Sequence, residues 1–473
     1  MSHNNHATIS THRLLAIILL FTTAYTHADL TSLAKNDAYP IFSTLNFDDE
    51  VLLTADQLRY KNVDWADKKK SRVGISISPF GQSADRGKTL RGQTTPIQPA
   101  TATFTDTALG DLTGRPGMIA LVFGATPEGK EWPTSLQTAA LHLFQEFPGS
   151  INDEGAIDPA QLFGYFSFPL TYRKRGIRFE LAARFYKDFG LRIQAGVSSI
   201  RQVVEDRIDT TSLSSFNPSP DTVNKDSVNT YLMSQVDIIA QQIGLNLCNF
   251  IQTSSEELRF NFFWRHAYEM NEDAENDWAY FLLIPYAQVS ASISPGNILN
   301  TNQQFAAVFG NNGHNSYGFT AGVNFDFVET IELGGEIGLT AFSKKSFCDY
   351  RVPNSKFQTT FFPFTTAATV KPGHNWHFGA RIAAYHFLGN LSTYFEWFVI
   401  DHKQDSITLQ NPDPAFLPCY LEKTTSFKTK LANVSFNYDI SPNIGLGFLV
   451  QIPFSQRNSY RSSTLMGGIN ATF

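Results

Sequence analysis

Apolar and polar residues alternate along most of the chain from about residue 162 to the C-terminus. Between residues 177 and 186 the odd-numbered positions are apolar, whereas Arg178, Glu180 and Arg184 lie at even-numbered positions. Successive side chains of a β-strand point to opposite faces of the sheet, so this period of two predicts a strand with one apolar and one polar face. A short turn at 187–190 followed by renewed alternation predicts a β-hairpin.

The hairpin pattern recurs, and short turns alternate with long polar connections. The short turns are predicted at 187–190, 328–330, 388–390 and 440–443, and the long connections include 204–255, 345–373 and 403–425. The last strand is predicted at 462–473. We predict about 14 strands in total, since bacterial barrels have even numbers, and 12 or 16 also fit the pattern.

The beginning of the strand region has a weaker pattern. We expect the first strand near residues 72–80 and the second near 117–124. Two stretches, 134–147 and 227–247, instead have apolar residues at helical spacing. The strand order places the first helix on the side of the short turns and the second in a long loop on the opposite side.

Strands with one apolar face can cross a bilayer only when they close into a ring. In hydrocarbon every backbone donor and acceptor must be satisfied within the protein, and closure removes the unpaired edges. Sorting of short turns to one end and long loops to the other is typical of outer-membrane barrels. Residues 71–473 are therefore predicted to form an all-β transmembrane antiparallel up-and-down β-barrel, with one or two helical segments in its connections.

The N-terminus has the layout of a secretory signal peptide. Arg13 precedes an apolar run from Leu14 to Phe21, and Thr26-His27-Ala28 supplies small residues for cleavage. The apolar run is shorter than the ~20 residues that a membrane-spanning helix needs. We therefore expect residues 1–28 to be a cleaved signal peptide and the polar stretch 29–70 to be a periplasmic lead-in.

Composition and charge limit the partners. The formal net charge is -6, and loss of residues 1–28 removes one arginine and no acid. A modestly acidic chain gives no support to nucleic-acid binding. Three cysteines, Cys248, Cys348 and Cys419, allow at most one disulfide. A Cys348–Cys419 bridge between two loops and unpaired thiols both fit the sequence.

The final strand carries the sharpest similarity to a known family. Its sequence, Met466-Gly467-Gly468-Ile469-Asn470-Ala471-Thr472-Phe473, combines alternation with an aromatic last residue. In this the chain resembles the Gram-negative outer-membrane β-barrel, porin-like proteins. The resemblance implies an outer-membrane location in lipid, and it implies that Gly468, Ala471 and Phe473 form an assembly signal read by the barrel-assembly machinery.

Charged residues on the strands are expected to face the lumen, because an arginine or lysine facing lipid at mid-membrane costs about 2 to 4 kcal/mol. The predicted pore-lining residues are Arg178, Glu180, Arg184, Arg192, Glu332, Glu336, Arg381 and Glu396. Two interpretations remain open. The opposite charges can set a transverse field across a water-filled channel, or they can form salt bridges that plug the interior.

Other candidate sites have simpler explanations. His374 and His377 are three apart on a predicted strand, so they point to opposite faces and do not suggest a metal site. His314 lies near Ser316, but no third member of a catalytic triad is identifiable. The acidic run 271–277 lacks the spacing of a calcium loop. We expect neither metal, cofactor nor enzymatic activity.

The sequence thus predicts a porin-like channel for passive diffusion of small hydrophilic solutes or ions. One alternative is a non-conducting structural or adhesion barrel that acts through its extracellular loops. A further alternative is an outer-membrane barrel hydrolase. The identity of the solute and the formation of a homo-oligomer are left open.

Overall fold

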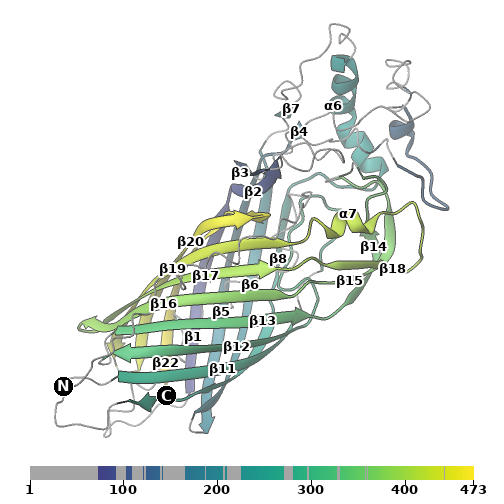
Figure 1. The fold of residues 1–473 in the computed structure, drawn as a ribbon. Helices are drawn as coiled ribbons and strands as arrows, with labels where there is room; N and C mark the ends of the chain where they lie inside the picture. The colour runs from purple at the N-terminus through teal and green to yellow at the C-terminus, as the bar shows by residue number, and fades with distance from the viewer. Residues whose placement is uncertain are drawn as a thin grey trace, which may run out of the picture.

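The main sheet of the protein closes on itself to form a barrel (Figure 1). The computed structural model describes residues 73–91, 103–108, 121, 124–138, 141, 166–186, 188–205, 208–209, 225–270, 281–295, 298–327, 331–356, 358, 361–441 and 443–473. The predicted signal peptide, 1–28, and the predicted lead-in, 29–70, lie outside these residues. No helix in the described part of the chain is both long and apolar enough to cross a membrane.

The ring has 12 antiparallel strands, and each one pairs with its two neighbours. In order around the wall they are β1 (Val73–Ala84), β5 (Leu170–Tyr186), β6 (Phe189–Val204), β9 (Leu258–Arg265), β11 (Phe281–Ile293), β12 (Ser316–Phe327), β13 (Ile331–Phe342), β16 (Asn375–Leu388), β17 (Leu391–His402), β19 (Phe427–Ser441), β20 (Ile444–Arg457) and β22 (Ser463–Thr472). Pairing of β1 with β22 closes the ring. The prediction of an all-β barrel is confirmed.

The central estimate of 14 strands is too high for the ring itself. Two further strands belong to the same sheet but lie outside the ring: β8 (Phe250–Ser255) pairs with β6, and β10 (Tyr268–Glu269) pairs with β11. Most of the strand expected at 117–124 lies outside the described residues, and the two that are described, Leu121 and Gly124, are not in a strand. In the ring β1 pairs directly with β5, so no other strand stands between them.

The direct pairing of β1 with β5 also corrects the side on which a helix was expected. The described part of the segment expected at 134–147 lies at the long-loop end and not at the short-turn end. Its described part includes a helical stretch at 134–138. There the backbone N–H and the hydroxyl of Ser135 donate to the side chain of Gln242 at 2.8 and 2.6 Å. Gln242 ends the helix α6 (Lys225–Gln242), which matches the helix predicted at 227–247.

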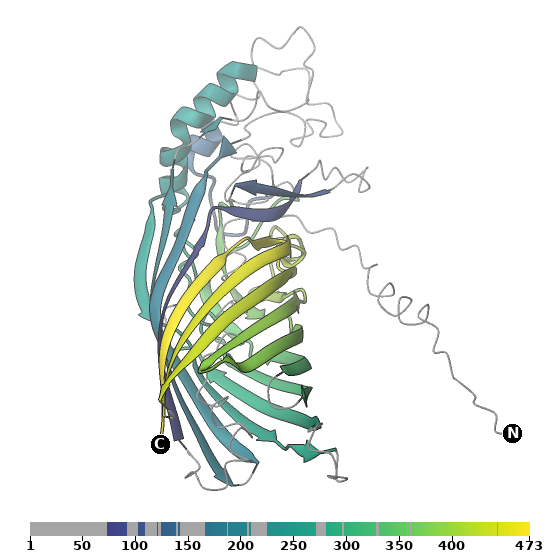
Figure 2. The same cartoon turned by 90° about the vertical axis from the view of Figure 1, so that its left-hand side faces the viewer.

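The long-loop end has its own secondary structure and its own apolar core. In Figures 1 and 2, α6 stands beyond the rim of the barrel, at the end opposite the C-terminus. Phe305 and Phe309 from the β11–β12 loop pack there with Val236 and Ile239 of α6. The other elements at this end are α7 (Pro418–Glu422), the sheet β14 (Lys345–Arg351), β15 (Thr365–Lys371) and β18 (Ser406–Leu409), the sheet β21 (Ser459–Tyr460), β2 (Arg86–Arg91) and β3 (Thr103–Ala108), and the pair β4 (Phe166–Ser167) and β7 (Ile208–Asp209).

The faces of the wall follow the alternation in the sequence. Outward-facing Phe179 and Ile382 have 47% and 54% of their surface exposed, whereas inward-facing Arg178 and Arg381 have 3% and 6% exposed. The last residues of β5, β12, β16 and β19, which precede the predicted short turns, lie at the end of the wall where the C-terminus lies. The structure therefore has an apolar outer belt, a polar interior and loops sorted by length, as the sequence predicted.

The three cysteines are free and exposed. The alternative of a Cys348–Cys419 disulfide is therefore not realised in this structure. Cys348 lies in β14 and Cys419 in α7, so both belong to the long-loop end.

The outer belt leads to a test of the membrane-facing surface. Ile337 lies near the middle of β13 with 54% of its surface exposed, and Ile298 lies in the β11–β12 loop with 45% exposed. We expect Ile337→Arg to lower the free energy of unfolding by about 2 to 4 kcal/mol in lipid, because the charge would face hydrocarbon. Ile298→Arg is the matched control and should have little effect. Urea unfolding of protein folded into lipid vesicles measures both, and equal effects would contradict the assignment of this face to lipid.

Candidate functional site: the barrel interior

The structure places all eight predicted pore-lining residues on inward-facing positions. Seven of them are buried inside the barrel: Arg178, Glu180, Arg192, Glu332, Glu336, Arg381 and Glu396. Arg184 is half-buried near the short-turn end of β5. Their part in lining a pore stays a prediction, but their partners are now defined. Charges of opposite sign come together in separate clusters that span several strands.

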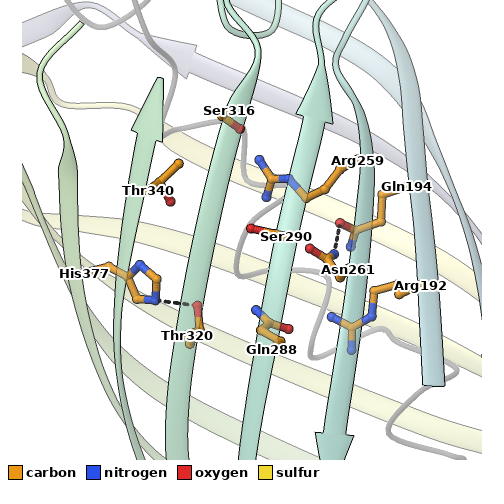
Figure 3. A pocket seen from close by; sticks show the side chains of 10 residues that line it. All are labelled: Arg192, Gln194, Arg259, Asn261, Gln288, Ser290, Ser316, Thr320, Thr340 and His377. Atoms are coloured by element: carbon orange, nitrogen blue, oxygen red, sulfur yellow. Dashed lines mark hydrogen bonds between the residues drawn. The ribbon is translucent and has the colours of Figure 1, made fainter. Parts of the chain in front are cut away.

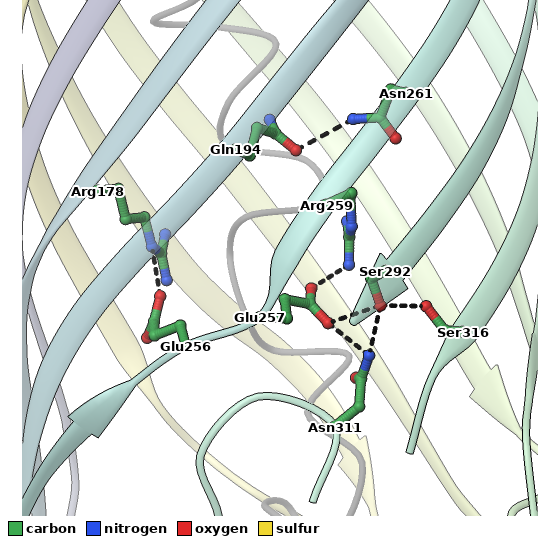
Figure 4. Close-up of polar contacts among 9 residues, drawn as sticks. All are labelled: Arg178, Gln194, Glu256, Glu257, Arg259, Asn261, Ser292, Asn311 and Ser316. Carbon is green, nitrogen blue, oxygen red and sulfur yellow. Dashed lines mark hydrogen bonds and ion pairs between the residues drawn. The ribbon is translucent and has the colours of Figure 1, made fainter. Parts of the chain in front are cut away.

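One cluster lies between β8, which is outside the ring, and the wall strand β9. Glu256 and Glu257 separate β8 from β9, and both side chains are buried. The carboxylate of Glu256 binds Arg178 Nε at 3.2 Å (Figure 4). It also binds Lys174 Nζ at 2.6 Å. The guanidinium of Arg178 also lies over the ring of Phe80, 4.0 Å from its centroid. A single carboxylate thus forms ion pairs with two cations at this site.

The neighbouring Glu257 connects the wall to a loop. It pairs with Arg259, and it accepts hydrogen bonds from Asn311 and from the hydroxyl of Ser292 (Figure 4). The β11–β12 loop reaches this site through Gly310, which has a φ of 53°. A Cβ on Gly310 would lie 3.0 Å from the backbone nitrogen of Glu257, so glycine suits both the conformation and the close approach.

A second ion cluster joins three strands, β9, β13 and β16. Glu332 binds Arg381 Nη2 at 3.0 Å and Arg265 Nη2 at 3.6 Å. Tyr385 donates its hydroxyl to the same carboxylate at 3.4 Å. Loss of one member of a buried ion pair is costly because a charge remains without compensation. The cluster therefore holds two charges that the sequence assigned to the interior, Glu332 and Arg381, in direct contact.

The histidine motif separates as its spacing predicts. His377 faces the interior, where its Nε2 lies 3.3 Å from the hydroxyl of Thr320 and 3.8 Å from Glu336. His374 is exposed and packs edge-on against Trp376. The described residues contain no group of three or more His, Cys, Asp or Glu side chains placed to hold a metal ion.

The proposed hydrolase motif does not assemble either. His314 Nδ1 lies 2.7 Å from the carbonyl oxygen of Ser343, and burial lowers the pKa of the His314 imidazole. The hydroxyl of Ser316 instead lies 2.6 Å from that of Ser292. Each side chain thus has a structural partner, and the described contacts do not link His314 to Ser316.

A chain of mainly uncharged side chains runs around the opposite part of the interior. Its hydrogen bonds measure 2.9 to 3.4 Å. In order it links Glu396 of β17, Asn433 of β19, Gln451 of β20, Thr464 of β22, Gln82 of β1 and Tyr172 of β5. These bonds cross the β1–β22 closure, so the polar interior is continuous across the point where the ring closes.

A polar cavity remains between these clusters (Figure 3). Six strands line it, and four serine and threonine hydroxyls from β11, β12 and β13 contribute. The other lining side chains are Arg192, Gln194, Arg259, Asn261, Gln288 and His377. The space open to the centres of water-sized molecules is about 30 Å³. One water needs roughly 10 to 15 Å³ by this measure, so the cavity suits a few waters or a very small solute.

Sequence reasoning missed most of this cavity. It named charged residues on well-patterned strands, but not the amides Gln194 and Asn261 or the ions Glu256 and Arg259. A signal was present in the sequence, because Gln194 continues the inward face of Arg192, and Arg259 and Asn261 are two residues apart. The interruption at Glu256 and Glu257 hid the register of that strand.

Only the comparison with solved structures found similar proteins, and the similarity is one of fold. No family model matches the chain, and no curated protein matches it. Among solved structures, it is similar to the COG4313 outer membrane channel from Pseudomonas putida F1, with 9% identity and a TM-score of 0.43 over 86% of this chain and 98% of that one.

Two other solved structures are less similar. The Pseudomonas putida toluene transporter TodX shares 8% identity over 95% of this chain and 98% of its own, with a TM-score of 0.28. The transport unit of the autotransporter AIDA-I from Escherichia coli shares 11% identity over 89% and 97%, with a TM-score of 0.32. Likenesses this distant say nothing about solutes or partners. By its own coordinates the chain forms a closed antiparallel β-barrel with an apolar outer belt and a polar interior.

Proposed function

We propose that the barrel is a narrow outer-membrane channel through which small hydrophilic solutes or ions diffuse passively. The observation that carries this proposal is the polar cavity between β6, β9, β11, β12, β13 and β16. A solute that leaves water loses hydrogen bonds, and the cavity offers amides, hydroxyls and cations that replace them. An apolar interior of the same size would exclude such a solute.

The proposal includes a strict limit on solute size. Phe80, Tyr385, Tyr394, Leu449 and Met466 point into the barrel and pack as one buried cluster. Together with the ion clusters they fill much of the interior of a 12-stranded ring. Passage beside these side chains favours solutes of few heavy atoms over oligosaccharides or peptides.

The pairing of charges supports low selectivity by net charge. Glu256 faces two cations, and Glu332 also faces two, so both of these carboxylates have positive partners. Opposite charges across a lumen produce a transverse field, which orients dipolar solutes and water. The expected selectivity therefore rests on local sites and on size.

The proposal also includes the predicted export signal and the predicted assembly signal. Residues 1–28 would direct export, and Gly468, Ala471 and Phe473 on the last strand would serve in assembly of the barrel. Phe473 has 69% of its surface exposed, which leaves its side chain accessible to a partner. The proposal includes no catalytic step, metal or cofactor.

A structural or adhesion barrel is the second candidate, and one observation favours it. The long loops are packed together, because the buried Arg351 side chain donates to the carbonyls of Phe362 and Ile243 at 2.7 Å and to Asn302 at 3.0 Å. A firm loop surface suits recognition of another cell or molecule. On this alternative the interior serves only to stabilise the wall.

Single-channel recording separates the two candidates. Purified, refolded protein that shows heat-modifiable migration should produce small stepwise currents in planar lipid bilayers. Protein that is folded by the same criterion but remains silent over a wide range of salt concentrations would contradict the channel and favour the structural barrel.

A charge-balanced substitution tests whether the ion cluster at Glu332 restricts passage. We expect the double variant Arg381→Ala/Glu332→Ala to raise single-channel conductance, because it removes bulk and keeps the net charge. Asp401→Ala/Lys403→Ala is the matched control, since those residues form a 3.1 Å pair at the rim with the side chain of Lys403 51% exposed. Equal conductance in both double variants and the wild type would mean that the Glu332 cluster does not line the route.

A further inference from the structure

The polar cavity has an unusual balance of lining groups. Of the side chains that line it, Arg192, Arg259 and His377 can carry positive charge, and none is a carboxylate or an aliphatic group. They come from three strands, β6, β9 and β16, and lie together with amides and hydroxyls (Figure 3). Such a surface offers several hydrogen-bond donors to one small molecule.

Arg192 has a donor that the described residues do not satisfy. Its side chain is 9% exposed, and its Nε has no hydrogen-bond acceptor among them. The nearest paired carboxylate oxygen, Glu180 Oε1, lies 3.8 Å away, which is too far for a hydrogen bond. A buried guanidinium with an unsatisfied N–H is destabilising, and an anionic acceptor in the cavity would satisfy it.

An ion pair with Glu257 fixes the side chain of Arg259. It pairs with Glu257 through Nη2, and Glu257 is itself held by Asn311 and Ser292. A guanidinium has five N–H donors, so this pair leaves others for the cavity. The two arginines lie on adjacent strands, since Arg192 is opposite Asn261 and Gln194 is opposite Arg259 in the β6–β9 pairing.

The carboxylates around the cavity limit the charge of its ligand. Glu180 stands near Arg192, Glu257 pairs with Arg259, and Glu336 lies 3.8 Å from His377. These acids lie behind the lining groups and offset their charge. The site therefore has no excess of positive charge, and a dianion would meet repulsion from the acids. The unsatisfied Nε of Arg192 offers a place to one carboxylate group.

We propose that this cavity binds a small monocarboxylate that carries a hydroxyl group, with its carboxylate on Arg192 and Arg259. The fork of a guanidinium matches the two oxygens of a carboxylate. Amides such as Gln288 and nearby hydroxyls then bind the hydroxyl group of the ligand. The inference deepens the proposed function by naming a class of solute, but binding can be measured whether or not the barrel conducts.

Glycolate is a suitable probe because it has one carboxylate, one hydroxyl and few atoms. Titration into refolded wild-type protein in detergent micelles, followed by saturation-transfer NMR, should give saturable binding. Arg192→Gln should weaken that binding about tenfold or more, since a charge-assisted bond is lost. Arg201→Gln is the matched control, because Arg201 lies on the same strand but is exposed on the outer face, and it should bind as the wild type does.

A second variant keeps the test valid if Arg192→Gln does not fold. Gln288→Leu retains both arginines and should weaken glycolate more than acetate, because only glycolate has the hydroxyl. Ethylene glycol, which lacks the charge, should not compete. The inference is overturned if Arg192→Gln, folded by heat-modifiability, binds glycolate like the wild type, or if ethylene glycol displaces glycolate.

These outcomes are separate from those of the proposed function. A barrel that binds glycolate but passes no current would retain the site and refute the channel. A barrel that conducts but does not bind glycolate would retain the channel and refute the site.

Discussion

The backbone hydrogen bonds of the wall are the constraint on which the rest of the structure depends. In a bilayer the strand edges have no water to bond, so the first and last strands must pair with each other. They do so up to the last residue, where the N–H of Phe473 donates to the carbonyl of Val73 at 2.9 Å. Once the ring is closed, every strand has one face toward lipid and one toward the interior. The period of two in the sequence is the direct consequence.

The interior then has to hold polar side chains in a small volume. It does so by pairing them across strands: Glu256 with Lys174 and Arg178, and Glu332 with Arg381 and Arg265. Buried charges are stable only when they are compensated and hydrogen-bonded. The result is a set of clusters that brace the wall and leave a polar cavity between them. The salt-bridged clusters and the polar cavity thus occupy different regions of the same barrel. The water-filled channel stays a prediction.

The sequence was sufficient for features that depend on local pattern. Because residues alternate between the two faces of a strand, the position of each charged residue in the alternation predicts its face, and this placed Arg178 and Arg381 inside. The helical spacing after residue 227 identified α6. The partners of the charges were not predictable in this way. Glu256 meets Lys174 because of the stagger between strands far apart in sequence, and single-sequence patterns contain no information about that stagger. The central count of 14 failed for a related reason, since β8 and β10 pair with the sheet but lie outside the ring, and local pattern does not distinguish such strands from those of the wall.

The account is tested most directly by measuring which side chains along one strand face lipid. After replacement of Cys248, Cys348 and Cys419 by serine, single nitroxide labels can be placed in turn at positions 376–382 of β16 in protein folded into vesicles. Electron paramagnetic resonance should find high accessibility to oxygen at 376, 378, 380 and 382 and low accessibility at 377, 379 and 381. Accessibility that is uniform, or that repeats every three to four residues, would contradict the barrel wall and everything derived from it.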